Sequence, residues 1–146
     1  SGGMKRRLMI GMALLHKPKM LFLDEPTVGL DPQVRRKMWD LIRKMNEAGM
    51  TVLLTTHYIE EADQLCRRVA IMNRGRIIAV DTPQKLKEKV GRVVVEHMEA
   101  DGMISNFFDN REQAASYVAG LNSNATVREA NLEDVFIELT GRRVND

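Results

Sequence analysis

The sequence predicts an α/β fold with a parallel sheet. Two short apolar segments, residues 20–23 and 51–56, lack charged side chains, as buried strands of parallel sheets do. Segments with apolar residues at three- and four-residue spacing lie around them, which is typical of amphipathic helices. Because strands that alternate with helices form parallel sheets, we expect ligand-binding residues just beyond the C-terminal ends of these strands.

The first half of the chain begins with a predicted helix. Apolar residues recur from Met4 on one helical face until Pro18 stops the pattern. We expect the strand that follows to be buried on both faces. Asp31 then supplies an N-cap and Pro32 a first-turn proline for a second helix, which continues to Gly49. The elements after the second strand are a helix at 59–65, strands at 69–72 and 77–80, and a short basic helix after Thr82 and Pro83.

The pattern changes after residue 90, so we expect two parts. Residues 1–90 would form the parallel sheet with its helices, and residues 91–146 a small α+β appendage. In the appendage, the sequence predicts a strand at 93–96, a helix at 111–121, a strand at 125–129 and a helix at 132–139. The chemistry is expected in the first part, where the parallel strands lie.

The composition bears on the class of protein, although the charge total alone excludes little. The chain carries 22 Lys and Arg against 20 Asp and Glu, a balance without the basic excess of a nucleic-acid binder. No apolar run approaches the roughly 20 residues that span a bilayer, so direct membrane insertion is not expected and a membrane role would come through a partner. The single cysteine, Cys66, cannot form an internal disulfide and fits a reducing, cytoplasmic setting.

Two carboxylates and a histidine end the apolar segments. Asp24 and Glu25 follow the first strand, and His57 follows the second, beside them if the strands are neighbours. Carboxylates at the end of a buried strand are costly unless a metal ion, a water or a hydrogen-bond donor meets them. In phosphoryl transfer such an Asp holds Mg²⁺, and a neighbouring carboxylate orients and deprotonates the attacking water. The alternative is that both carboxylates cap the turn at Pro26 and that the histidine is structural.

The first three residues, Ser1, Gly2 and Gly3, directly precede a predicted helix. Backbone N–H groups at a helix N-terminus attract anions, and glycine permits a close approach. Such residues also start helices without binding a ligand, and both interpretations stay open.

Four segments in this order resemble the motifs of ABC ATPases. SGGMKRR is similar to the signature motif, MLFLDEP to the Walker B motif, VGLD to the D-loop and TTH to the switch-histidine loop. The resemblance is continuous from Ser1 to about Pro83. The residues after His57 look like those of transporter subunits, and the tail NLEDVFIELTGR is similar to the end of export and ABC-2-type subunits. The fold implied is part of a P-loop NTPase domain.

The resemblance implies roles for the residues after the two strands. In such ATPases Asp24 would hold Mg²⁺ through water, Glu25 would be the general base, and His57 would contact the γ-phosphate of ATP. ATP and Mg²⁺ are therefore the expected cofactors.

The resemblance also implies contacts across a dimer of two ATPase subunits. Ser1, Gly2 and Gly3 would bind the γ-phosphate of ATP held by the opposite subunit, and Asp31 would reach toward that subunit's phosphate loop. Met4 replaces the glutamine usual in the signature motif, a departure common among export-type members. A transmembrane transporter subunit is the other partner implied, which would place the chain at the cytoplasmic face of the membrane.

The phosphate loop itself is missing from the sequence. No GxxxxGK[ST] segment occurs in the 146 residues, so we expect a C-terminal fragment that neither hydrolyses ATP alone nor binds it tightly. The strand that leads into this loop is central in the family's sheet. Its absence predicts a gap whose unpaired strand edges would close, exchange between chains or dimerise.

The function expected is that of an ATPase subunit that couples ATP hydrolysis to transport. One alternative is a non-transport ABC ATPase of DNA repair or translation. Such proteins usually carry coiled-coil or basic insertions, which the sequence lacks. The other alternative is a regulatory or dimerisation module that works through residues 91–146. The transported substrate cannot be inferred, because the membrane subunit usually determines it.

Overall fold

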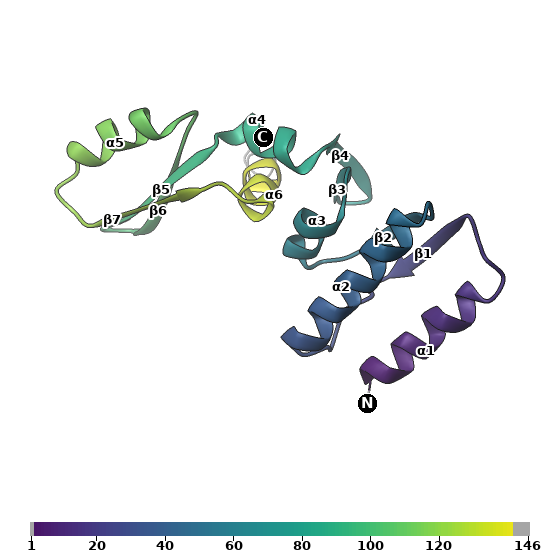
Figure 1. The fold of residues 1–146 in the computed structure, drawn as a ribbon. Coiled ribbons are helices and arrows are strands. Elements are labelled where there is room, and N and C mark those ends of the chain that lie inside the picture. The colour runs from purple at the N-terminus through teal and green to yellow at the C-terminus, as the bar shows by residue number, and fades with distance from the viewer. Residues whose placement is uncertain (1, 142–146) are drawn as a thin grey trace. The chain divides into compact units, whose positions relative to one another are not determined.

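The computed structural model describes residues 2–141, drawn in Figure 1. The chain divides into two compact units between Leu65 and Cys66. The boundary that the sequence suggests after residue 90 stays a prediction. Among the described residues, no helix is both long and apolar enough to cross a bilayer.

The first unit contains the predicted parallel strand pair. Strand β1 spans Met20–Asp24 and β2 spans Thr51–Thr55. The two strands pair in parallel with Asp24 opposite Thr55, so their C-terminal ends lie together. The prediction that the two strands are neighbours in the sheet is confirmed.

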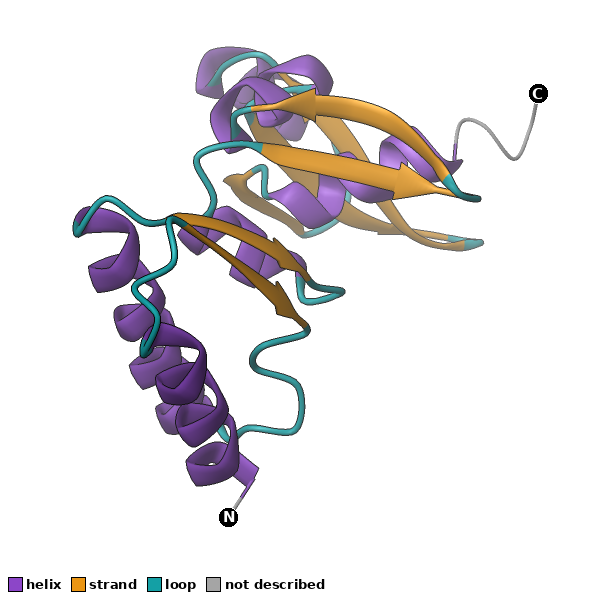
Figure 2. Cartoon of the chain, turned by 90° about the vertical axis from the view of Figure 1, so that its right-hand side faces the viewer, coloured by secondary structure: helices purple, strands orange, loops and turns teal. Residues whose placement is uncertain are grey.

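Three helices complete the first unit: α1 (Gly2–Leu14), α2 (Pro32–Glu47) and α3 (Ile59–Leu65). Helix α2 starts as predicted, because the Asp31 side chain accepts a 2.9 Å hydrogen bond from the Val34 N–H. Figure 2 shows helices along one side of the strand pair. The core there is formed by residues of α1, β1, the loop before α2, and α2, namely Ile10, Leu21, Leu23, Leu30, Met38, Ile42 and Met45.

The other face of the strand pair is open. Phe22 is 69% exposed and Leu53 51% exposed, so the prediction that the first strand is buried on both faces is wrong for the described residues. Helices of this unit cover only the face that carries Leu21 and Leu23. The apolar face of α1 predicted from Met4 onward is also exposed, and Ile10 faces the core instead.

The second unit starts with an antiparallel hairpin. Strands β3 (Val69–Asn73) and β4 (Arg76–Asp81) are joined by Arg74 and Gly75, whose φ angles are 49° and 75°. Two consecutive left-handed residues are typical of the tight turn that matches strand twist. Helix α4 (Pro83–Val90) follows where a short helix is predicted, and the Thr82 side chain caps it.

A three-stranded antiparallel sheet forms the rest of the second unit, in the order β6-β5-β7. Helix α5 packs on the sheet face that carries Val93 and Val95, and α6 packs against α4. The structure adds one strand, β6, to the expected order of strand, helix, strand and helix. The bounds are β5 Val93–Glu99, β6 Gly102–Phe108, α5 Arg111–Ala119, β7 Ala125–Glu129 and α6 Leu132–Gly141.

Candidate functional site

The candidate site lies at the C-terminal ends of β1 and β2. The hydroxyl of Thr55 donates a 2.5 Å hydrogen bond to Asp24 Oδ1, and the backbone N–H of Glu25 donates to the Thr55 carbonyl at 2.9 Å. The parallel register creates both contacts because Asp24 and Thr55 are direct partners. Thr55 therefore fixes both the side chain of Asp24 and the backbone of Glu25.

Glu25 and His57 form a polar pair beyond the strand ends. His57 Nδ1 lies 3.0 Å from Glu25 Oε1, and the His57 backbone N–H donates to Glu25 Oε2 at 3.3 Å. The Glu25 side chain is one-third exposed and that of His57 about two-thirds exposed (33% and 64%), so both remain open to solvent and to a ligand. The proximity expected from the sequence is confirmed, and the roles of the two residues stay predictions.

The backbone at Glu25 is unusual. Its φ angle of 46° places a residue other than glycine in the left-handed region, at a cost of about 1 kcal/mol. Such conformations persist where surrounding contacts fix them, and they gather at functional sites. Here Thr55 accepts from the Glu25 N–H, and the Glu25 carbonyl accepts from the Val28 N–H at 3.3 Å. The turn directs the Glu25 carboxylate to His57.

The segment that carries His57 is braced by its neighbours. The Tyr58 N–H donates to Thr56 Oγ1 at 2.9 Å, and the Tyr58 ring lies 4.5 Å from that of His57, between ring centroids. The guanidinium carbon of Arg35, on α2, lies 4.6 Å from the centroid of the Tyr58 ring, a cation–π arrangement. Contacts from α2 therefore help to hold the residues beside the imidazole.

The other residues predicted for the site are Ser1, Gly2, Gly3 and Asp31. Ser1 lies outside the described residues. Gly2 and Gly3 form the first residues of α1, as expected for a helix start. Asp31 caps α2 and is exposed.

A buried carboxylate in the same unit was missed by the sequence reasoning. Glu61, on α3, is fully buried, and its Oε1 accepts hydrogen bonds from Thr27 Oγ1 at 2.8 Å and from Trp39 Nε1 at 3.0 Å. Its second oxygen, Oε2, is buried without a hydrogen-bond partner in the described part of the chain. The available sequence signal is the spacing of Tyr58, Glu61 and Leu65, which puts a charged residue on a helical apolar face.

Asp24 is suited to an Mg²⁺ ion. No cluster of three or more potential metal-ligating side chains occurs among the described residues. Mg²⁺ commonly keeps several waters and uses one or two carboxylates together with substrate phosphates, so a single exposed carboxylate is sufficient. Asp24 is exposed, and Thr55 orients one of its oxygens.

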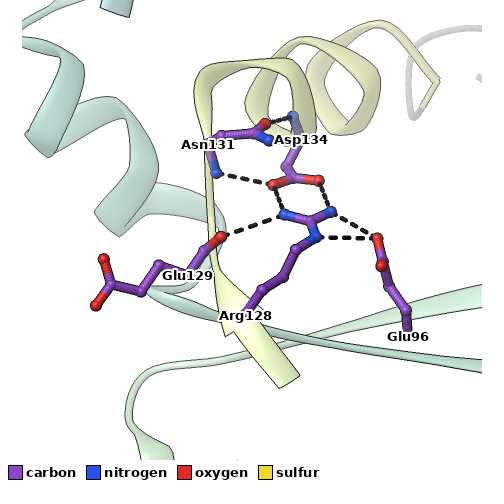
Figure 3. A network of polar contacts seen from close by, with 5 residues as sticks. All are labelled: Glu96, Arg128, Glu129, Asn131 and Asp134. Atoms are coloured by element: carbon purple, nitrogen blue, oxygen red, sulfur yellow. Dashed lines mark hydrogen bonds and ion pairs between the residues drawn. The ribbon is translucent and has the colours of Figure 1, made fainter. Parts of the chain in front are cut away.

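The second unit contains a separate polar network, shown in Figure 3. Arg128 donates to both oxygens of Asp134 at 2.7 and 2.8 Å, and to Glu96 Oε1 at 2.6 and 3.1 Å. Asn131 and Asp134 exchange hydrogen bonds at the start of α6, from the Asn131 N–H at 2.8 Å and the Asp134 N–H at 3.0 Å. These contacts join β5, β7 and α6, so we interpret the network as structural.

Burial and hydrogen bonding oppose one another at Asp134. Burial tends to raise the pKa of Asp134, but the hydrogen bonds from Arg128 and Asn131, with the Arg128 charge, outweigh burial and leave that pKa below its usual value. The same contacts, from Asp134 first and then Glu96, raise the pKa of Arg128. Arg128 and Asp134 are therefore both charged at neutral pH.

Known proteins similar to this chain include two bacterial ATP-binding proteins. The linearmycin resistance ATP-binding protein LnrL of Bacillus subtilis is 36% identical over 178 residues, and the Nod factor export ATP-binding protein I of Burkholderia thailandensis is 42% identical over 167 residues. Each match covers 100% of this chain, but only 57% and 55% of the respective relative. The chain thus spans little more than half the length of these relatives.

Three solved structures and one family model also match this chain. An ATP-binding subunit of an ABC transporter matches 96% of this chain and 44% of its own length, with a TM-score of 0.60 and 26% identity. A dimeric ATP-binding cassette in a post-hydrolysis state, bound to ADP and phosphate, matches 56% of this chain and 35% of its own length, with a TM-score of 0.51 and 32% identity. A family model for an AAA domain, whose description includes the AbiEii toxin of a type IV TA system, matches residues 1–63.

The fold predicted from the sequence, part of an ABC ATPase cassette, is thereby confirmed. A nucleotide-free ATP-binding cassette from an ABC transporter also matches 60% of this chain and 35% of its own length, with a TM-score of 0.56 and 27% identity. Over all of its residues, the chain with its small parallel sheet and two antiparallel sheets thus matches a portion of the ATP-binding proteins of ABC transporters.

Proposed function

We propose that this chain supplies the general base and the switch histidine of an ATPase subunit that drives export through a separate membrane protein. The observation that supports this most directly is the 3.0 Å contact between His57 Nδ1 and Glu25 Oε1 beyond two adjacent parallel strands. Ligand sites of open α/β sheets lie at such strand ends. The name of the Nod factor export relative supports the transport role.

In this proposal Glu25 accepts a proton from the water that attacks the γ-phosphorus of ATP. Each carboxylate oxygen has two lone pairs, so an oxygen that accepts one hydrogen bond from the His57 segment can accept another from water. Nδ1 of His57 faces Glu25, and the other ring nitrogen, Nε2, remains for the γ-phosphate. Mg²⁺ held through water by Asp24 would neutralise phosphate charge when bound.

The proposed active form is a dimer of two such subunits on a transmembrane partner. Ser1, Gly2 and Gly3 would bind the γ-phosphate held by the opposite subunit, and Asp31 would reach that subunit's phosphate loop. The dimeric cassette with ADP and phosphate that resembles this chain supports the arrangement. The transmembrane partner would place the protein at the cytoplasmic face of a membrane.

The 146-residue chain alone is proposed to be inactive. It contains no GxxxxGK[ST] segment, so no phosphate loop surrounds the β- and γ-phosphates. Without those backbone N–H groups and the lysine, Glu25 has no positioned substrate to act on.

The experiment compares this chain with a loop-extended chain. We define the loop-extended chain as residues 1–146 preceded by the residues of the Burkholderia Nod factor export relative that lie ahead of its matched part. Phosphate release should be at background for the 146-residue chain and measurable for the loop-extended chain, and Glu25→Gln should lower the latter by about 100-fold or more. Glu25-dependent turnover by the 146-residue chain would refute the inactivity. Hydrolysis by the loop-extended chain that falls by less than about fivefold in Glu25→Gln would refute the proposed role of Glu25.

A further inference from the structure

The loop after β1, helix α2 and helix α3 meet at one buried oxygen atom. Glu61 Oε1 accepts from Thr27 at 2.8 Å and from Trp39 at 3.0 Å, across 34 and 22 residues of sequence. Thr27 and Glu61 are both fully buried, and Trp39 is nearly so.

These three segments carry the candidate site. Thr27 lies two residues after Glu25 and four before Asp31, and Glu61 lies four residues after His57. The Glu61 N–H also donates to the Tyr58 carbonyl at 2.9 Å, which ties the carboxylate-bearing turn of α3 to the residue beside His57. A change in the position of Glu61 would therefore act on the candidate site from both strand ends.

We propose that Glu61 is a positioning residue that couples the loop holding Glu25 and Asp31 to the segment holding His57. Its Oε1 fixes the spacing between the two segments, and the 3.0 Å contact between Glu25 and His57 depends on that spacing. Packing alone would favour an apolar side chain here, because a buried carboxylate with one oxygen unpartnered is costly. The catalytic part of this inference rests on the proposed function.

Trp39 allows the coupling to be measured in the 146-residue chain itself. It is the only tryptophan of the sequence, so one indole N–H resonance in a ¹⁵N-labelled sample reports the bond to Glu61. The imidazole resonances of His57, assigned with His57→Gln, report the other end of the coupling.

The variants distinguish a loss of the coupling through Glu61 from a general loss of folded structure. Glu61→Leu removes the acceptor, whereas Glu61→Gln keeps an oxygen that can accept from both Thr27 and Trp39. Glu60→Leu is the matched control, because Glu60 is the exposed neighbour on the same helix. Thr27→Val removes one bond without changing the carboxylate, and it decides the outcome if Glu61→Leu does not fold.

We expect the Trp39 indole resonance and the His57 resonances to shift in Glu61→Leu. In Thr27→Val, the His57 resonances should shift. In Glu61→Gln and Glu60→Leu, the indole and His57 resonances should stay near their original positions. In the loop-extended chain, Glu61→Leu should lower kcat about tenfold or more, because small displacements of reacting groups are costly. KM for ATP should change by no more than about twofold, since no direct substrate contact is lost. Glu61→Gln should retain most of kcat.

A folded Glu61→Leu or Thr27→Val variant whose His57 resonances do not move would overturn the coupling. An unchanged kcat in such a variant would overturn its catalytic consequence. If the loop-extended chain shows no hydrolysis that depends on Glu25, the proposed function fails instead. The resonance measurements then still decide whether Glu61 positions His57.

Discussion

His57 Nδ1 lies 3.0 Å from Glu25 Oε1, although 32 residues separate them in sequence. Two structural features bring them together. The parallel register places the ends of β1 and β2 side by side, and the left-handed backbone of Glu25 turns its carboxylate to the imidazole. The strand register and the turn at Glu25 thus both place the Glu25 carboxylate beside the His57 imidazole.

The first prediction concerns Glu25. In the loop-extended chain, Glu25→Gln keeps the size of the side chain and removes the base, so kcat should fall by about 10²- to 10⁴-fold, the usual contribution of general base catalysis. Steady-state phosphate release at saturating ATP measures this. Glu60→Gln, the same change at an exposed position, should leave kcat unaltered. A loss of less than about fivefold in Glu25→Gln would contradict a general-base role.

The second prediction separates two possible roles of Asp31. Its side chain caps α2, and replacing a cap with alanine costs about 1 kcal/mol. Asp31→Ala should therefore lower the melting temperature of the 146-residue chain by several degrees, and Asp31→Asn, which can still accept from the Val34 N–H, should not. Circular dichroism on heating measures both.

The Asp31→Asn variant then tests contact with the opposite subunit. It keeps the cap but removes the charge, so reduced kcat in the loop-extended chain at unchanged stability would support a role across the dimer. Equal kcat values for Asp31→Asn and the unchanged protein would limit the Asp31 carboxylate to capping.

The third prediction concerns the network around Arg128. Arg128→Leu removes the guanidinium donor of Glu96 and leaves Asp134 with the Asn131 N–H, so the free energy of unfolding at neutral pH should fall by about 2 kcal/mol. Urea unfolding followed by circular dichroism measures the change. Arg111→Leu is a suitable control, because its 3.4 Å pair with Glu129 is exposed, and it should cost less than about 1 kcal/mol.

The same network gives a pH dependence with a defined sign. Since the pKa of Asp134 is lowered in the folded protein, the carboxylate contributes stability above its unfolded pKa of about 3.9, and this contribution is lost as pH falls through the lower folded value. The stability difference between the unchanged chain and Asp134→Asn should thus be largest near neutral pH and shrink below about pH 4. A difference that grows on acidification would contradict the assignment.

Local signals explain what the sequence could predict. The structure agrees with the predicted Asp31 cap, the helix start at Thr82 and Pro83, the turn at Gly75 and the ends of β1 and β2, because each depends on residues close in sequence. The contact between Glu25 and His57 followed from one further assumption, that the two strands are neighbours.

Features that depend on distant residues were missed. The burial of Glu61 requires Thr27 and Trp39 as donors, and neither is near it in sequence. Strand β6 lacks a strict alternation of apolar and polar residues, because Ser105 and Asn106 are consecutive, so its pairing with β5 was not visible. The missed contacts are tertiary: the spacing of Tyr58, Glu61 and Leu65 could place a charged residue on an apolar helical face, but it does not identify the donors that meet it.

The last prediction concerns the open face and free edges of the strand pair. Phe22 and Leu53, direct partners in the register, are both largely exposed, and in the described part of the chain β1 and β2 pair only with each other. Unpaired strand edges and exposed apolar surface promote association. The average molecular mass of the 146-residue chain in light scattering should therefore rise with protein concentration. Phe22→Lys should reduce this association, because a lysine on the open face is costly to bury. Lys37→Met, which adds an apolar residue on the exposed side of α2, is the control for a general change of charge and should not reduce association. A chain that stays monomeric at high concentration would show that this face and these edges do not drive self-association.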